Sequence, residues 1–250
     1  RNHVGDAFDV SPLVGIDECI PTVAPCVVDG IDLPDHGEAW TRAWRLDDDR
    51  LSDGCVATEL RLMTRPLCIR RELRLTGATL RLDYTLENLS AAPVDYAWAL
   101  HPLLAMRAGD RIEVAVDDRL GRVDTAAGIA GLTADDTCTW PQVTPEIRAD
   151  GLRLGDDLAS LKLYLPTPEP AQFAVVNDRD GTALRGRYGP AENLPYLGVW
   201  ITRGGWNGYH HFALEPTNTN ADRLQRDPTP ATQLPAGALR QWFVEWTLGA

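Results

Sequence analysis

The sequence has no excess of positive charge. Asp and Glu outnumber Lys and Arg by 36 to 24 over 250 residues, which gives a formal net charge of −12. Nucleic acids and anionic membranes are bound by dense Lys and Arg, so we expect neither as a partner. No apolar run reaches the roughly 18 residues that span a membrane, and no signal peptide opens the sequence. These absences predict a cytoplasmic protein.

Cysteine is scarce, and no metal-binding pattern is present. The five cysteines are odd in number and include no Cys-x-x-Cys pair; they are Cys19, Cys26, Cys55, Cys68 and Cys138. This spacing fits reduced thiols better than a disulfide framework or a zinc site. His-x-His, His-Glu-x-x-His and Gly-rich phosphate-loop patterns are also missing. We therefore expect free thiols and no metal.

Helical periodicity is lacking over any stretch of ten residues or more. Alternating or compact apolar segments recur instead, at residues 40–46, 58–63, 69–75, 80–87, 111–116, 161–165, 172–176, 197–202, 209–217 and 239–248. A period of two marks strands with one buried and one wet face. Residues 117–158 are rich in Gly, Asp, Thr and Ala, which predicts an irregular excursion. The chain reads as one all-β antiparallel domain, residues 1–250, built as a sandwich or barrel.

Tryptophan is in excess, with eight Trp against four Phe. Its flat face and single N–H donor suit a sugar ring as well as a core. We expect at least one of Trp44, Trp140, Trp200 and Trp206 to line a ligand cleft. The alternative is that all four belong to the core.

Two of the expected strands end in a proton-active side chain directly before proline, in His101-Pro102 and Glu215-Pro216. Proline pushes the preceding residue to an extended conformation, so each side chain is expected at a strand end. An imidazole and a carboxylate facing one cleft are the minimum set for general acid–base catalysis. The plain alternative is a histidine with structural partners at the end of a strand.

Further polar candidates lie on the same strand or in loops. By period two, His211, Ala213 and Glu215 share a strand face, and the small Ala213 leaves room for a ligand. His36, in a loop, supplies another imidazole. Asp17 and Glu18 are adjacent, so only one of them can face a given pocket.

Taken in order, these segments resemble the aldose 1-epimerase (galactose mutarotase-like) family. The resemblance rests on the Asp35-His36-Gly37 loop, residues 82–88 with Pro93 and His101-Pro102, residues 197–200 with Leu214-Glu215-Pro216, and residues 234–237 before an aromatic strand. It implies a β-supersandwich with little helix and a sugar cleft across one sheet. It also implies interconversion of the α and β anomers of an aldose through the open-chain aldehyde, without a metal or organic cofactor.

The resemblance assigns roles to individual residues. Glu215 is the base that takes the proton of the anomeric hydroxyl, and His101 is the acid that protonates the ring oxygen. His36 hydrogen-bonds the sugar. We expect one ring to lie between Glu215 and His101. Further substrate contacts are expected from Glu18, Arg42, Trp200 and His211. We expect the protein to be a monomer or homodimer that binds a small-molecule sugar as its substrate.

The chain departs from the family pattern in two places. The Asn- and Arg-containing motif near the family's N-terminus has no clear counterpart, and residues 15–21 stand in its place. The family's sugar-binding Asp also has no clear counterpart in this chain, and Asp178 is the candidate for it. The substrate is therefore an aldose or an aldose derivative. Two other classes stay open, because a fold does not decide function: a non-catalytic carbohydrate-binding or regulatory protein, and a carbohydrate lyase or hydrolase.

Overall fold

The computed structural model describes Phe8 and residues 15–52, 54–116, 120–154, 158–224 and 229–249. Strands dominate these residues, and the named helices are the short 3₁₀ helices η2 (Asp48–Arg50), η3 (Ala149–Gly151) and η4 (Pro230–Thr232). The expected all-β class is therefore confirmed. In the part of the chain so described, no helix is long and apolar enough to cross a membrane.

The first large sheet carries the central His-Pro and Glu-Pro strands. Its order is β1 (Ile16–Cys19), β9 (Ala99–Pro102), β18 (His210–Thr217), β17 (Tyr196–Arg203), β14 (Ser160–Pro166), β12 (Leu120–Ala127) and β13 (Thr137–Thr139), with β10 (Leu104–Ala105) paired to β18. All of these pairings are antiparallel. Strands far apart in sequence thus become neighbours.

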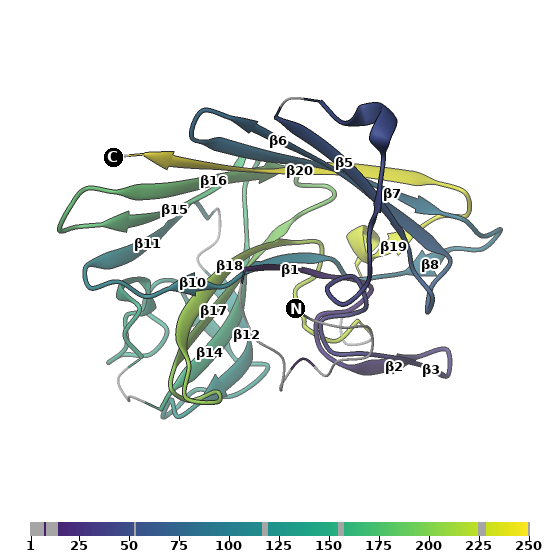
Figure 1. Ribbon diagram of the computed structural model, residues 1–250. Coiled ribbons are helices and arrows are strands. Elements are labelled where there is room, and N and C mark those ends of the chain that lie inside the picture. The colour runs from purple at the N-terminus through teal and green to yellow at the C-terminus, as the bar shows by residue number, and fades with distance from the viewer. Residues whose placement is uncertain are drawn as a thin grey trace.

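The second large sheet lies over the first (Figure 1). Its order is β11 (Asp110–Val114), β15 (Ala171–Asn177), β16 (Ala183–Gly189), β20 (Leu239–Gly249), β7 (Thr79–Asn88), β6 (Leu67–Thr76), β5 (Cys55–Arg61) and β4 (Arg45–Leu46). Two small ribbons accompany the large sheets: β2 (Cys26–Val28) with β3 (Ile31–Leu33), and β8 (Val94–Asp95) with β19 (Gln233–Leu234).

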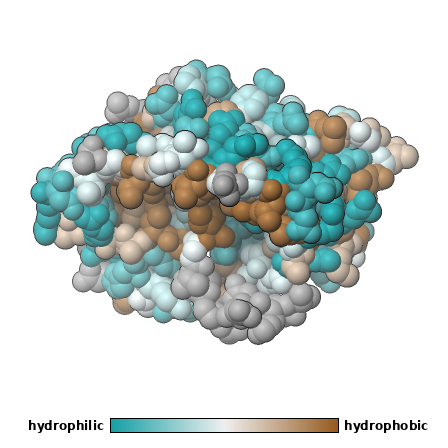
Figure 2. All heavy atoms as spheres, turned by 45° about the horizontal axis from the view of Figure 1, so that its top comes forward, coloured by the Kyte–Doolittle hydropathy of each residue, from teal (hydrophilic) through white to brown (hydrophobic). Residues whose placement is uncertain are grey.

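The hydrophobic core fills the space between the two large sheets. Leu163 and Val199 of the first sheet and Leu82 and Val244 of the second belong to one buried cluster. Since side chains alternate along a strand, the neighbours of Leu163 in β14 must point to the outer face. Figure 2 shows hydrophilic residues over the upper part of the molecule and a band of hydrophobic residues across its middle.

Several local expectations are wrong. Residues 117–158 contain β12 and β13, and residues 183–189 form β16. Residues 40–46 are mainly turn, with only β4 extended. β12 was hidden because its Gly, Asp, Thr and Ala residues give no apolar alternation, while pairing with β13 and β14 holds it in the sheet. Pro216 lies inside β18 and does not end it, whereas β9 ends at Pro102, as expected.

Candidate active site

The outer face of the first sheet gathers polar side chains from neighbouring strands. Asp17 of β1 lies opposite His101 of β9, and Glu215 of β18 lies opposite Gly198 of β17. On β14, Lys162 lies opposite Trp200. A cavity of about 230 Å³ opens on this face, lined by Phe8, Val23, Asp35, His36, His101, Leu103, Thr125, Lys162, Trp200, Trp206, His211 and Asp222. That is smaller than the roughly 300–1,000 Å³ that drug-sized ligands occupy, and it suits one sugar ring.

The structure brings His101 and Glu215 into direct contact. His101 Nε2 lies 3.3 Å from Glu215 Oε1. The Glu215 side chain has no exposed surface and lies beneath the cavity floor, whereas His101 lines the cavity. The expectation that one sugar ring lies between the two side chains is therefore wrong, because the 3.3 Å gap has no room for it.

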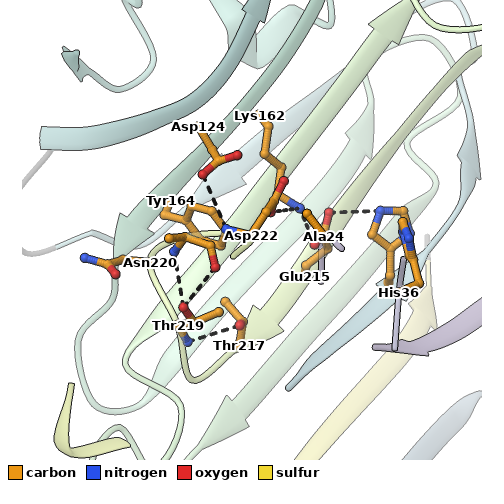
Figure 3. A network of polar contacts seen from close by, with 12 residues as sticks. Ala24, His36, Asp124, Lys162, Tyr164, Glu215, Thr217, Thr219, Asn220 and Asp222 are labelled. Atoms are coloured by element: carbon orange, nitrogen blue, oxygen red, sulfur yellow. Dashed lines mark hydrogen bonds and ion pairs between the residues drawn. The ribbon is translucent and has the colours of Figure 1, made fainter. Parts of the chain in front are cut away.

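Glu215 belongs to a polar network that also contains Lys162 and Asp222 (Figure 3). Lys162 Nζ donates to Glu215 Oε2 at 2.5 Å and lies 3.7 Å from Asp222 Oδ1. Asp222 Oδ1 also accepts a hydrogen bond from the Tyr164 hydroxyl. A register shift in β12 between Val123 and Thr125 brings in Asp124, whose Oδ1 accepts from the Asp222 backbone N–H at 3.3 Å. Sequence reasoning missed Lys162 and Asp222.

One signal for Lys162 was present in the sequence. Of the 24 Lys and Arg residues, 23 are arginine, and Lys162 is the only lysine. A residue type used once, in a chain that otherwise always uses Arg, marks a position where the two are not interchangeable. Asp222 gave no such signal, because the chain has many acidic residues and Asp222 lies in a loop without a motif.

His36 is held in place by an unusual loop conformation. His36 and Gly37 both have positive φ, 57° and 66°. A Cβ on Gly37 would lie 2.0 Å from the carbonyl oxygen of Ile20, so only glycine fits there. The Glu38 N–H donates to that same oxygen at 2.9 Å. Such strained backbone clusters at functional sites.

The imidazole of His36 sits beside that of His101. Its Nδ1 lies 3.1 Å from Asp35 Oδ1, and Phe8 stacks on its ring with centroids 3.4 Å apart. The His36 and His101 rings meet edge to face at 5.0 Å. The Asp35-His36-Gly37 loop therefore brings a second imidazole to the cavity.

Aromatic residues form a wall of the cavity. Of the four candidate tryptophans, Trp200 and Trp206 line it, and their contact with a ligand stays a prediction. Trp200 Nε1 donates to His211 Nε2 at 3.1 Å, so His211 is also in the cavity wall, as expected. Of the other two candidates, Trp140 is in the core, and Trp44 packs under the Arg71 guanidinium at 4.2 Å.

Glu18 points away from the cavity, into the space between the sheets. Its carboxylate accepts hydrogen bonds from Tyr84 Oη at 2.7 Å, Trp98 Nε1 at 2.9 Å and Arg71 Nη1 at 3.1 Å. Strand alternation decides this, because Asp17 occupies the outer face. The expectation that Glu18 contacts substrate is corrected to a buried structural role.

Arg42 and Asp178 are also not among the cavity-lining residues. Arg42 Nη1 donates to Glu38 Oε2 at 2.9 Å. Asp178 lies 3.5 Å from Arg111, beside a different surface hollow. The carboxylates that line the cavity are Asp35, from the His36 loop, and Asp222, from the segment after β18.

Burial shifts the proton affinities of the site. Desolvation, together with the charges of His36, Lys162 and His211, lowers the pKa of His101 well below its usual value. Desolvation raises the pKa of Glu215, and Lys162 opposes that rise. Burial also lowers the pKa of His211 to about 4. At neutral pH both His101 and His211 are therefore neutral in the free protein.

Three buried polar atoms of the site lack a hydrogen-bond partner among the described residues. They are His36 Nε2, His101 Nδ1 and Glu215 Oε1. Buried polar groups are normally satisfied, so such a group calls for an explanation. A ligand rich in hydroxyl groups could satisfy all three.

No group of three or more His, Cys, Asp or Glu in the described part of the chain is arranged to hold a metal ion. All five cysteines are free thiols.

A larger hollow of about 560 Å³ lies along the second sheet. Its guanidinium and carboxylate groups pair with each other, as in Arg70 with Glu59 and Arg74 with Glu72.

Comparison with known proteins identifies the architecture. No protein-family model matches the chain, and no curated protein is similar to it in sequence. Solved structures do match. A galactose mutarotase-like protein from Lactobacillus casei superposes with a TM-score of 0.67 at 17% identity, over 94% of this chain and 85% of that one. The chain has the galactose mutarotase-like fold.

Other structures with this fold match equally well. A "putative aldose 1-epimerase" from Escherichia coli K12 gives a TM-score of 0.68 at 13% identity, over 94% of this chain and 84% of that one. A galactose mutarotase related enzyme from Lactobacillus acidophilus gives 0.67 at 14%, over 94% and 83%. The mutarotase-like fold expected from the sequence is thus confirmed, and the chemistry has to be argued from the site.

Proposed function

We propose that this protein is an aldose 1-epimerase that interconverts the α and β anomers of an aldose or aldose derivative by acid–base ring opening. The observation that carries the proposal is the set of three unpartnered buried atoms, His36 Nε2, His101 Nδ1 and Glu215 Oε1. His36 and His101 line a cavity with tryptophan in its wall, and Glu215 lies beneath its floor in contact with His101. Hydroxyl groups and a flat ring face are what a sugar offers to such a site.

The contact between His101 and Glu215 suits this reaction better than a wide separation. Ring opening removes a proton from the anomeric hydroxyl and delivers one to the ring oxygen. Both oxygens are bound to the same carbon, so they lie side by side. An acid and a base 3.3 Å apart can therefore address both oxygens from one side of the sugar.

In this proposal Glu215 Oε1 accepts the proton of the anomeric hydroxyl, which enters between His101 and Lys162. His101, in its protonated form, donates to the ring oxygen, and the C1–O bond to that oxygen breaks to give the aldehyde. Rotation about the adjacent C–C bond and the reverse proton transfers close the ring on the other face. His36 hydrogen-bonds the sugar, and Trp200 supplies apolar contact.

A second candidate is a carbohydrate-binding protein without catalysis. The complete burial of Glu215 beneath the cavity floor favours it, because a base must reach its proton to act. A binding protein would make the same sugar contacts but would not accelerate anomer exchange.

Exchange spectroscopy by NMR separates the two candidates. A panel of free and phosphorylated aldoses is equilibrated with and without protein, and the rate of anomer exchange is measured for each. We expect at least one aldose to exchange faster than in the protein-free buffer. Sugar binding without faster exchange would favour the binding protein, and absence of both would contradict the two candidates together.

A further inference from the structure

Lys162 is the only lysine of the chain, and it lies in the candidate site. Its residue surface is 3% exposed. Burying an ammonium group is costly unless it is paired and hydrogen-bonded. Apart from histidine, every other positively charged side chain of the protein is an arginine. The guanidinium of arginine is a wide planar group, whereas lysine has a compact ammonium at the end of a thin alkyl chain. The position therefore requires a narrow cation.

The sheet explains how that cation reaches Glu215. Lys162 lies on β14 and Glu215 on β18, and β17 separates these two strands. The lysine side chain must therefore cross β17. Gly198 stands opposite both Tyr164 and Glu215 on that strand. A Cβ there would lie 3.2 Å from Glu215 Cβ and 3.3 Å from its Oε2, so the glycine keeps the path open.

The two carboxylate oxygens of Glu215 are in different situations. Oε2 accepts from Lys162 Nζ, whereas Oε1 faces His101 without a hydrogen bond. We propose that Lys162 is the positioning residue of Glu215: its ammonium binds Oε2, holds the group as a carboxylate and leaves Oε1 free for the proton of the sugar. This inference rests on the proposed function of the site.

The charges around the pair agree with this role. Desolvation opposes the charge on Lys162, but the Glu215 and Asp222 carboxylates outweigh it and raise the lysine pKa. Desolvation raises the pKa of Glu215, and Lys162 is the strongest group that opposes it. The ionisable groups that face the pair from the surrounding elements include Cys19, His36, His101, Asp124, Tyr164 and Asp222.

The same charges exclude a covalent role for Lys162. Attack on the open-chain aldehyde requires a neutral amine. Two carboxylates keep this amine protonated, so it donates hydrogen bonds and does not attack. Borohydride added during turnover should therefore leave the mass of the protein unchanged, and a sugar adduct at Lys162 would overturn the assignment.

Lys162→Met tests the role through the pH profile. Methionine keeps the length of the side chain and removes its charge. Without that charge the pKa values of Glu215 and His101 both rise, because Lys162 lowers both. We expect both limbs of the kcat/KM profile to move to higher pH by about one unit, with a loss of about tenfold or more near pH 5. Lys162→Arg should restore part of the shift.

Ser160→Ala is the matched control. Ser160 is buried on the same strand and face, and its hydroxyl bonds to Thr202 Oγ1 at 2.8 Å. Its loss should lower thermal stability without moving either limb. In a Glu215→Gln background Lys162→Met should cost little further activity, because the lysine acts through the missing base. A loss in Lys162→Met at every pH with unmoved limbs would overturn the role.

A second measurement does not require the Lys162 variants to fold. Labelling the protein with [ε-13C]lysine gives a single side-chain signal, because there is one lysine. Its titration midpoint should fall in Glu215→Gln, which lacks one counter-charge; an unchanged midpoint would overturn the pairing. Wild-type protein that exchanges no anomers overturns the proposed function, whereas active protein with unmoved limbs in Lys162→Met overturns only the role of Lys162.

Discussion

His101 Nε2 lies 3.3 Å from Glu215 Oε1, on strands β9 and β18 of one sheet. The acid and the base of the proposed reaction therefore form one unit. Residues that act as a unit lose activity together and not additively. Replacing either residue should disable the pair.

The first prediction is that Glu215→Gln and His101→Gln each lower catalysed anomer exchange by at least about a hundredfold, the lower end of what a positioned acid or base supplies. The double variant should be little worse than either single variant. NMR exchange rates give the activities, and circular dichroism checks that each variant is folded. Near wild-type exchange in folded Glu215→Gln would disprove its role as the base.

The second prediction concerns pH. His101 must be protonated to act as the acid, and its pKa is lowered by burial and by neighbouring positive charges. The active form therefore becomes rarer as pH rises, and kcat/KM should fall about tenfold per unit above the His101 pKa. At low pH Glu215 becomes protonated and can no longer act as the base. Because its pKa is raised, this loss of activity begins at a higher pH than for an ordinary glutamate.

The optimum should consequently lie below neutral pH. The measurement is the rate between pH 4.5 and 8.5, with the exchange of a protein-free buffer subtracted at each pH. A flat profile between pH 6.5 and 8.5 would contradict protonated His101 as the acid.

The third prediction concerns the loop that carries His36. Gly37→Ala places a methyl group 2.0 Å from the Ile20 carbonyl oxygen, so the loop must move and take His36 with it. We expect weaker sugar binding, seen as a raised KM, and lower stability. Gly30→Ala is the control, because Gly30 also has positive φ, at 74°, but has no atom within 4 Å of the added Cβ. Equal effects of the two variants would show that backbone strain, and not the contact with Ile20, matters.

The fourth prediction distinguishes a structural from a substrate-binding role for Glu18. Glu18→Leu removes the acceptor of three donors, the buried Tyr84 and Trp98 and the partly buried Arg71 guanidinium. Breaking a buried pair in this way costs about 3–5 kcal/mol. The free energy of unfolding, measured with urea, should fall by about this amount. A stable variant with only a raised KM would restore the expectation that Glu18 contacts substrate.

The sequence predicts the strands best where one face is apolar and the other charged. β6, β7 and β20 alternate clearly, and the structure contains all three. β12 has only two large apolar residues, Leu120 and Val123, and their spacing of three does not alternate, so its extended form depends on partners distant in sequence. Alternation also cannot tell which face points inward, since a shift of one residue exchanges the faces. The sequence alone therefore does not tell that Asp17 takes the outer face beside His101 and Glu18 the inner one.

The site was predictable where a local motif marks it. His36, His101, Trp200, His211 and Glu215 come from such motifs or from the strands that carry them. Lys162 was missed because it lies within an apolar strand, where a charged residue is normally interpreted as facing solvent. The direct contact between His101 and Glu215 depends on the pairing order of the sheet, which no short segment contains.

The link between Gly37 and Ile20 has a dynamic consequence. β1 is a four-residue strand at the edge of its sheet; within the described residues it pairs with β9, and Ile20 directly follows it. Edge segments open at lower free energy than the centre of a sheet. When β1 detaches, Asp17 separates from His101 and the His36 loop loses its anchor at Ile20 in the same event. Sugar binding and closure of this edge are then one equilibrium, and bound sugar should slow hydrogen exchange in β1 while leaving that of β17 unchanged.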